Sequence, residues 1–457
     1  MSKRKHTGKL PVQELLPVKA PLSVLALFSL GQFGWSLASY AVGNLLVYFY
    51  LPPEQGTPMF PAFIFQGPVL WFFTLIGLIS ALGRILDGVV DPLVANWSDR
   101  KDTIRGKRKW FMLRGAIPFA LFGALAFFPA EASEAGTNVV WIGLVIGLYY
   151  FFFAFYVIPY NALMAELGHT PKERLRISTM VSVAWALGFV AGNSMYALQG
   201  FFESRGDTPL EAFQTGIIWL QAVALVCMLL PALFLNEMKY ARQVSSDAPV
   251  LHSVRSVFGN KNFRWFLFGI LLYWLALTFI QLGIGYYTTL LLGLDKSEAF
   301  SFSLISFGCS FIFYFPVSWM AGKYGKRHLM LGAFIIFALI FLITAFSPYL
   351  PVPKLYLMYG LAVAASVPLA IFGILPNAIV GDEVEKTVST GGLQVTGMYF
   401  GVTAFTMKIG ISIANLVFPS LLLFGRSLEN AKGVQLTSLA AAAFCLLGWL
   451  AFRRFRE

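Results

Sequence analysis

Charged residues inside the apolar stretches of this chain are few, which makes them the first candidates for chemistry. The clearest are Arg84, Asp87 and Asp91 in one stretch and Lys408 in another. At spacings of i, i+3 and i+7, the first three share one face of a helix. A charge in hydrocarbon is costly unless it is paired or faces water. We therefore expect this face to line a polar cavity.

Two carboxylates one helical turn apart can offer oxygens to Na⁺, or can share one proton, because two like charges at close range are unfavourable. We predict that Asp87 and Asp91 bind a coupling cation, with no other metal site. Arg84 and Lys408 are expected to face the same cavity, Lys408 as the partner of the acids. An alternative is that the charges of this helix only form ion pairs with a neighbouring helix.

The elements that must position these side chains are membrane helices. Of the 457 residues 58% are hydrophobic and 12% charged, whereas about a quarter are charged in soluble proteins. A helix that spans a bilayer needs about 20 apolar residues. Such runs fill the chain, so we predict an all-α membrane protein that uses the lipid bilayer as solvent. The expected spans are residues 22–50, 68–97, 110–129, 138–165, 175–202, 213–235, 262–293, 297–322, 327–347, 354–380, 391–424 and 434–453.

Lysine and arginine alternate between rich and poor loops along these spans. If the N-terminus is cytoplasmic, the basic clusters at 100–109, 172–176 and 323–327 all fall inside, as the excess of Lys and Arg on cytoplasmic loops requires. We predict an inner (plasma) membrane protein with both termini cytoplasmic. The same placement accounts for the net charge of +12 without nucleic acid as a partner.

Sequence echoes divide the chain into two halves. The basic stretch 96–109 after the second span has a shorter partner at 321–328 after the eighth, and P-Y-N-A at 159–162 has a partner P-N-A at 376–378. Parallel repeats of six helices around a central cavity are typical of the major facilitator fold. We predict a first half at 1–235, a cytoplasmic linker at 236–261 and a second half at 262–457.

Several familiar motifs are absent from the sequence. It contains no Walker A motif, no H-E-x-x-H and no Rossmann fingerprint, which argues against ATP-driven transport and against a catalytic domain. We expect no enzymatic activity and no cofactor beyond a coupling Na⁺ or H⁺.

Two further sets of residues are candidates for the transport path. Tyr156 ends the aromatic run 149–156 and is the ring we place in the cavity. Polar residues near the water interface are too close to bulk solvent to bind a solute. We predict that a cytoplasmic gate, completed by the basic 323–328 region, is formed by Asp99, Arg100, Arg105 and Arg108.

The second span carries the most specific motif. G-R-I-L-D-G-V-V-D-P (83–92), followed by S-D-R (98–100) and R-G-K-R-K-W (105–110), resembles the signature of the glycoside–pentoside–hexuronide:cation symporters, the melibiose permease group. G-M-Y-F-G with Lys408 (397–408) also matches. This resemblance implies that Asp87 and Asp91 are cation-site carboxylates and that Lys408 is the lysine of the eleventh helix.

The chain departs from that family at several positions, two of which concern the acids that bind a sugar. Ser36 stands where melibiose permease-like proteins carry an aspartate after the first-helix G-x-F-G, and Val157 stands where they carry a sugar-binding aspartate. We place Ser36 and the nearby Gln32 in the cavity. A site without these carboxylates suits a different solute, and the family also includes lysophospholipid symporters that keep the second-helix acids.

These observations lead to one functional prediction with alternatives. We predict cation-coupled symport of a small polar solute, a sugar or glycoside, by alternating access in a monomer. The alternatives are a lysophospholipid or other amphiphile symporter, and an uncoupled facilitator or transporter-like receptor. Coupling separates them, because a receptor would bind without accumulating anything.

Overall fold

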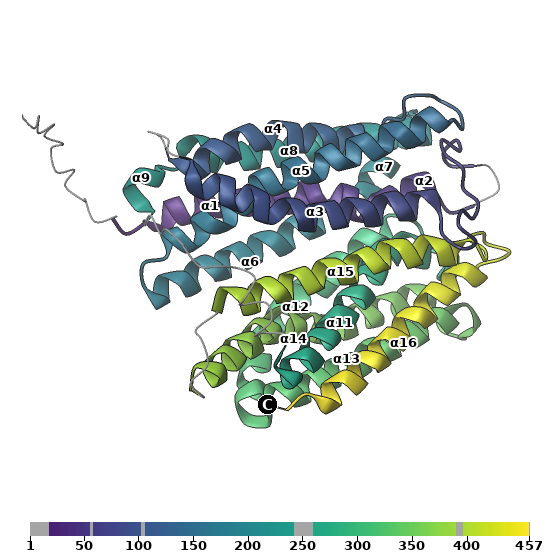
Figure 1. Cartoon of the computed structure of the whole chain (residues 1–457). Helices are drawn as coiled ribbons and strands as arrows, with labels where there is room; N and C mark the ends of the chain where they lie inside the picture. The colour runs from purple at the N-terminus through teal and green to yellow at the C-terminus, as the bar shows by residue number, and fades with distance from the viewer. Residues whose placement is uncertain (1–17, 55–57, 102–105, 242–258, 390–395, 457) are drawn as a thin grey trace, which may run out of the picture.

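A computed structural model describes residues 18–54, 58–101, 106–241, 259–389 and 396–456. These residues form a nearly all-helical bundle without a named strand (Figure 1). The first six long segments are α1 (Leu22–Tyr40), which continues through a π-helical turn (Ala41–Leu45) into α2 (Leu46–Tyr50), then α3 (Leu75–Arg100), α4 (Lys107–Leu125), α5 (Gly136–Leu167), α6 (Pro171–Asn193) continuing as α7 (Met195–Glu203), and α8 (Pro209–Phe234). After the short α9 (Glu237–Tyr240), the second six are α11 (Lys261–Tyr286) with a π-helical end (Tyr287–Leu291), α12 (Glu298–Tyr324), α13 (Lys326–Phe346), α14 (Lys354–Ser389), α15 (Thr396–Leu422) and α16 (Lys432–Arg454).

Most of these segments can cross a bilayer. Within the described residues, 10 helices are long and apolar enough to do so. The two remaining long helices are α3 and α4, and α3 carries the charged residues on which the sequence analysis depends. The predicted all-α, multi-pass membrane protein is confirmed.

The predicted start of the second span at residue 68 is wrong by several residues. Val69 and Phe73 exchange backbone hydrogen bonds of 2.6 and 3.0 Å across a tight turn, and Trp71 at its tip has a positive φ of 74°. The helix begins only after Thr74, whose hydroxyl accepts a hydrogen bond of 3.2 Å from the backbone N–H of Gly77. This N-cap satisfies one of the free donors that every helix start leaves. The apolar run of the second span therefore begins in the turn before α3, several residues ahead of the helix itself.

The two sets of six segments pack in the same pattern. In the first, α1 packs on α6 and α8, α4 on α5 and α8, and α3 on α5; in the second, α11 packs on α15 and α16, α13 on α14 and α16, and α12 on α14. Numbered in chain order within each set, these are the same pairs of positions. The contacts between the sets, α3 with α15 and α12 with α6, are equivalent in the same way. The structure thus carries the twofold repeat that the sequence echoes indicate, and we refer to the two sets as the N-terminal and C-terminal halves.

Both described termini lie at one end of the bundle, which we call the terminal end (Figure 1). The backbone N–H of Val18 donates to the carbonyl oxygen of Lys239 at 2.9 Å, and Asn262 forms two hydrogen bonds of 2.7 Å with the backbone of Arg456. The chain therefore crosses the bundle an even number of times. Residues 242–258 of the predicted linker lie outside the described residues, and its boundaries stay a prediction.

Candidate functional site

Residues from both halves meet at a cluster of four charges, which we call the central cluster. The Nζ atom of Lys408 on α15 lies 2.8 Å from Oδ2 of Asp87 on α3 and also forms an ion pair with Asp91. On the other side, Nη1 of Arg84 lies 3.4 Å from the same oxygen of Asp87, whose side chain is completely buried. All four residues singled out in the sequence are brought together.

Close packing of α3 on α15 positions this cluster. A Cβ atom on Gly77 would lie 3.0 Å from Pro419 and 3.2 Å from the carbonyl oxygen of Leu416, so glycine at this position favours the close approach of the two helices. Further along, a Cβ on Gly88 would lie 3.5 Å from Phe405 and 4.0 Å from Lys408. Because α3 and α15 belong to different halves, the cluster ties the halves together.

Aromatic rings of α5 cover the guanidinium of Arg84. Its Cζ atom lies 5.2 Å from the ring centre of Tyr150 and 6.0 Å from that of Phe153. The electron-rich ring faces stabilise a cation at this distance. Arg84 is therefore held within the N-terminal half, whereas Lys408 reaches the acids from the C-terminal half.

Two oxygens of the cluster remain without hydrogen bonds. Oδ1 of Asp87 and Oδ1 of Asp91 are buried and have no hydrogen-bond partner among the described residues. Buried acceptors without a partner are unfavourable, and carboxylate oxygens are ligands suited to hard cations and protons. The pair therefore fits a small monovalent cation or a proton. No group of three or more His, Cys, Asp or Glu side chains suited to a metal occurs in the described part of the chain.

The other predicted cavity residues do not contact the central cluster in the described structure. The hydroxyl of Tyr156 is fully buried and donates to the carbonyl oxygen of Met228 at 3.0 Å. Ser36 on α1 donates to the carbonyl oxygen of Trp185 on α6 at 2.8 Å, and Gln32 is buried on the same helix. Tyr156 and Ser36 thus link neighbouring helices of the N-terminal half, and a solute contact for any of the three stays a prediction.

Arg108 is the centre of an ion-pair network at the terminal end. Its Nη2 atom lies 2.6 Å from Oδ1 of Asp99 and 2.8 Å from Oε1 of Glu166, and its Nη1 donates to the Ser98 hydroxyl at 2.5 Å. Glu237 accepts a further hydrogen bond of 3.1 Å from the backbone N–H of Arg108. The sequence analysis missed Glu166 and Glu237, although both are acids next to apolar runs.

Ser98, Asp99 and Glu166 belong to the N-terminal half, and Glu237 lies on the short α9 that follows it. Arg100 is exposed at the last turn of α3, and Arg105 lies outside the described residues. The predicted gate between the halves, with its contact to residues 323–328, therefore stays a prediction.

The opposite end of the bundle, the distal end, holds a second network between the halves. Arg426, in the loop after α15, is almost fully buried. Its Nη2 lies 3.0 Å from Oε1 of Glu54 and donates to Gln66 at 2.6 Å, and its Nε donates to the carbonyl oxygen of Pro52 at 3.1 Å. The backbone N–H of Glu54 donates in return to the carbonyl oxygen of Arg426 at 2.8 Å.

Two more contacts join the halves at this end. The hydroxyl of Tyr286 on α11 donates to the carbonyl oxygen of Leu51 at 2.5 Å, and Lys296 lies 2.7 Å from the carboxylate of Glu203. Hydrogen bonds from Ser297 hold the pKa of Asp295, the residue before Lys296, below its usual range. We call these contacts the distal clamp, made by Glu54, Glu203, Tyr286, Lys296 and Arg426. The sequence indicates that these loops contain few basic residues, but it does not predict which residues Lys296 and Arg426 contact.

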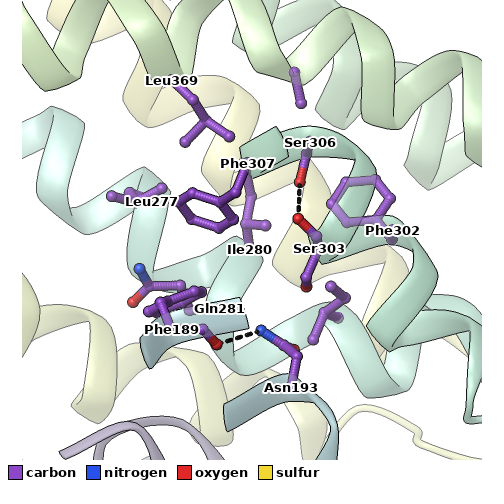
Figure 2. Close-up of a pocket in the computed structure, with 12 residues that line it drawn as sticks. Phe189, Asn193, Leu277, Ile280, Gln281, Phe302, Ser303, Ser306, Phe307 and Leu369 are labelled. Atoms are coloured by element: carbon purple, nitrogen blue, oxygen red, sulfur yellow. Dashed lines mark hydrogen bonds between the residues drawn. The ribbon is translucent and has the colours of Figure 1, made fainter. Parts of the chain in front are cut away.

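A separate pocket also lies between the halves (Figure 2). Helix α6 contributes Phe189 and Asn193, and the C-terminal half contributes Gln281, Ser303 and other residues of α11, α12 and α14. The side-chain amide of Asn193 donates to the carbonyl oxygen of Phe189 at 3.3 Å, and Figure 2 shows this hydrogen bond as a dashed line. The surface that this pocket exposes is almost entirely apolar.

Comparison with known proteins places this geometry in a family. The sequence profile described as MFS/sugar transport protein matches residues 27–452. Among curated relatives, the putative glycoside/cation symporter YagG of Escherichia coli K12 is 21% identical, covering 82% of this chain and 80% of the relative. The isoprimeverose transporter of Lactiplantibacillus pentosus is 23% identical, covering 88% of this chain and 80% of the relative.

Solved structures agree on the fold. The nucleoside transporter NupG superposes with a TM-score of 0.67 at 15% identity, covering 96% of this chain and 100% of that one. The xylose transporter XylE from E. coli, in a partially occluded inward-open conformation, gives 0.64 at 13% identity over 95% of this chain and 99% of that one. Together with the profile match, these comparisons show that the chain belongs to the MFS/sugar transport family, within the glycoside–pentoside–hexuronide:cation symporters of the major facilitator superfamily, and is a membrane transporter rather than an enzyme.

Proposed function

We propose that this protein is a cation-coupled symporter of a sugar or glycoside, located in the inner membrane with both termini cytoplasmic. Asp87 and Asp91 bind the coupling Na⁺ or H⁺, and the solute crosses between the two halves by alternating access. The observation that carries this proposal is that Lys408 on one half forms ion pairs with both acids on the other.

Charge balance explains how the cluster could couple a cation to movement. Two cationic side chains, Arg84 and Lys408, face two carboxylates, so the cluster is neutral in the described state. A cation that binds the free oxygens of Asp87 and Asp91 competes with the ammonium of Lys408. Release of Lys408 weakens the tie between α3 and α15. Because linkage is reciprocal, a cation that raises the affinity for solute by some factor has its own affinity raised by the same factor when solute is bound.

The distal clamp supports alternating access. It holds the distal end closed with hydrogen bonds and ion pairs between the halves. For solute to enter or leave at the distal end, the contacts of the distal clamp must break. Contacts between the halves at the terminal end must then form to close that side. The equivalent packing of the two halves makes such an exchange possible with little change inside each half, as in other transporters built from repeats.

The names of the relatives favour a carbohydrate as the transported solute. They describe glycoside, isoprimeverose and lactose transport. The proposal does not require a sugar-binding carboxylate in addition to Asp87 and Asp91.

Purified protein in vesicles tests the proposal. With an imposed Na⁺ or proton gradient, we expect isoprimeverose or lactose to accumulate above its external concentration, and accumulation to end when an ionophore removes the gradient. Sugar uptake that only equilibrates would identify an uncoupled facilitator. Binding without uptake would identify a receptor, and uptake of a lysophospholipid but of no sugar would contradict the proposed solute class.

A further inference from the structure

The terminal ends of α11 and α16 carry basic side chains that belong neither to the central cluster nor to the network of Arg108. Arg453 and Arg454 lie in the last turn of α16, and Lys261 and Arg264 lie in the first turn of α11. All four residues are exposed. Helix α16 packs on both α11 and α13, and its end lies near the mark C in Figure 1. A positive surface therefore lies where two membrane-spanning helices of the C-terminal half meet water.

Each of the two arginines at the end of α16 lies over a tryptophan ring. Cζ of Arg453 is 4.9 Å from the ring centre of Trp449, one turn earlier in the same helix, and Cζ of Arg454 is 4.7 Å from the ring centre of Trp265 on α11. The electron-rich face of an indole attracts a cation at this distance. A contact with a ring does not use the N–H groups of a guanidinium, which can still donate to an anion. The two tryptophans therefore hold both groups in place with their donors available.

Neither arginine is balanced by a carboxylate. Within the part of the chain that the structure describes, the side chains of Arg453 and Arg454 form no ion pair and no hydrogen bond. Glu383, a buried acid at the terminal end, accepts hydrogen bonds from Asn260 at 3.2 Å and from Asn262 at 3.0 Å instead. The fold therefore supplies the positive charges at the end of α16 but no anion for them.

Arg327 on α13 brings a third guanidinium to the same helix end. Its Nε donates to the carbonyl oxygen of Phe452 at 3.1 Å, and its Nη2 donates to the carbonyl oxygen of Arg453 at 2.7 Å. These carbonyl groups belong to the last turn of α16, where a helix carries about half a negative charge. This half charge is smaller than the two charges of Arg453 and Arg454 alone. The end of α16 therefore remains a site that attracts anions.

Exposed apolar side chains continue from the basic ones along both helices. Leu447, Leu450 and Arg454 share one face of α16 at spacings of i, i+3 and i+7, and the two leucines are 45% and 50% exposed. On α11, Phe268 follows Arg264 by one turn and is 45% exposed. A positive surface that continues into an apolar one matches a molecule with an anionic head and an apolar tail.

We propose that the terminal ends of α11 and α16 bind an anionic phospholipid, with Arg453 and Arg454 donating to its phosphate and Leu447 and Leu450 contacting an acyl chain. Arginine binds phosphate oxygens through paired, charge-assisted hydrogen bonds, and basic sites between membrane helices bind anionic headgroups. The exposed leucines favour a lipid over a soluble anion, which has no apolar part to contact them. None of these residues belongs to the central cluster or to the pocket in Figure 2, so the inference does not rest on the proposed function.

Thermal unfolding of the purified protein in detergent gives the first test. Added phosphatidylglycerol should raise the Tm of wild type, and Arg453→Gln and Arg454→Gln should each raise the lipid concentration for half of this effect about fivefold, as expected for one basic residue at an anionic lipid surface. The matched control is Lys323→Gln, which also removes one exposed positive charge beside a tryptophan, 5.4 Å from the ring of Trp319. An equal effect of the control would show that only the overall charge matters and would overturn the site.

Two further probes identify which part of the lipid is bound. Phosphatidylcholine has the same acyl chains with a zwitterionic head, and inorganic phosphate has the anion without the chains. We expect neither to reproduce the rise in Tm that phosphatidylglycerol causes in wild type. An equal rise with phosphatidylcholine would show that the arginines do not select the headgroup, and an equal rise with inorganic phosphate would show a site for a free anion. Either result would overturn the proposal.

Native mass spectrometry gives a measurement that does not depend on stability. After release from the detergent micelle, wild type should retain one more phosphatidylglycerol molecule than the double variant Arg453→Gln and Arg454→Gln. The double variant Arg453→Lys and Arg454→Lys should retain an intermediate amount, because lysine keeps the charge but not the paired hydrogen bonds. Equal retention by wild type and the glutamine variant would overturn the site. Neither measurement uses transport, so a failure of the proposed sugar symport would leave this test unaffected.

Discussion

Lys408 on α15 forms ion pairs with both Asp87 and Asp91 on α3, so a single ammonium group joins the two halves at the middle of the bundle. Neither acid has another ammonium partner in the described structure, and Asp87 is the one carboxylate with which Arg84 forms an ion pair there, at 3.4 Å. Any ligand that displaces Lys408 from the acids therefore acts on both the local charge and the contact between the halves.

The first prediction concerns the acids. Asp87→Asn and Asp91→Asn should each abolish accumulation against a gradient, because an amide cannot provide the negative charge that holds the cation. Exchange of solute down its own gradient should survive in part. Uptake into vesicles, with and without a cation gradient, measures both quantities. Wild-type accumulation with unchanged cation dependence in both variants would show that the acids are structural.

The second prediction concerns Lys408. Removing one member of a buried ion pair leaves an uncompensated charge, at a cost of about 3–5 kcal/mol. Lys408→Ala should therefore lower the Tm of the empty protein strongly, and the coupling cation should restore more stability than it adds to wild type. Lys326→Ala is the control, since its pair with Asp382 is partly exposed and should contribute at most about 1 kcal/mol.

For Lys408→Ala, the decisive measurement is the Tm in Na⁺ compared with that in a large organic cation, repeated at several pH values. A sodium-specific recovery indicates Na⁺, whereas recovery only on acidification indicates a proton. A Tm that responds to neither would contradict the assignment of the cation to these carboxylates.

A third prediction addresses the distal clamp. Glu54 and Ser427 are paired in an isolated bridge across the halves, and paired residues of adjacent segments lie close enough for a disulfide. In a background without Cys227, Cys309 and Cys445, the double variant Glu54→Cys and Ser427→Cys should lose uptake on oxidation and regain it on reduction. Undiminished uptake by fully cross-linked protein would show that the distal end need not open.

The fourth prediction separates gating from stability at the terminal end. Asp99 is 46% exposed in its side chain and Glu166 only 6%, although both bind Arg108. Asp99→Asn should change the Tm little and slow turnover, while the half-saturating solute concentration stays near the wild-type value. Glu166→Gln should lower the Tm more, because Glu166 is itself buried and its ion pair with Arg108 is shielded from water. Complete loss of solute binding in folded Asp99→Asn protein would count against a gating role.

Sequence alone was enough to predict the membrane helices, the repeat and the candidate cation residues. The length of an apolar run and the cost of a charge within it are local properties, so Asp87, Asp91 and Lys408 could be identified without knowledge of their neighbours. The start of the second span was misplaced because hydrophobicity does not distinguish a turn at residues 68–74 from the helix that the Thr74 cap begins.

Only the tertiary structure decided which of these groups meet. Lys408 and Asp91 are separated by 317 positions, and Arg426 and Gln66 by 360, and no local pattern specifies such pairs. The same holds for burial: the hydroxyl of Tyr156 donates to a backbone carbonyl, whereas the indole N–H of Trp35 has no hydrogen-bond partner among the described residues. Periodicity tells which side chains share a helix face, but what lies opposite that face depends on how the helices of the two halves pack.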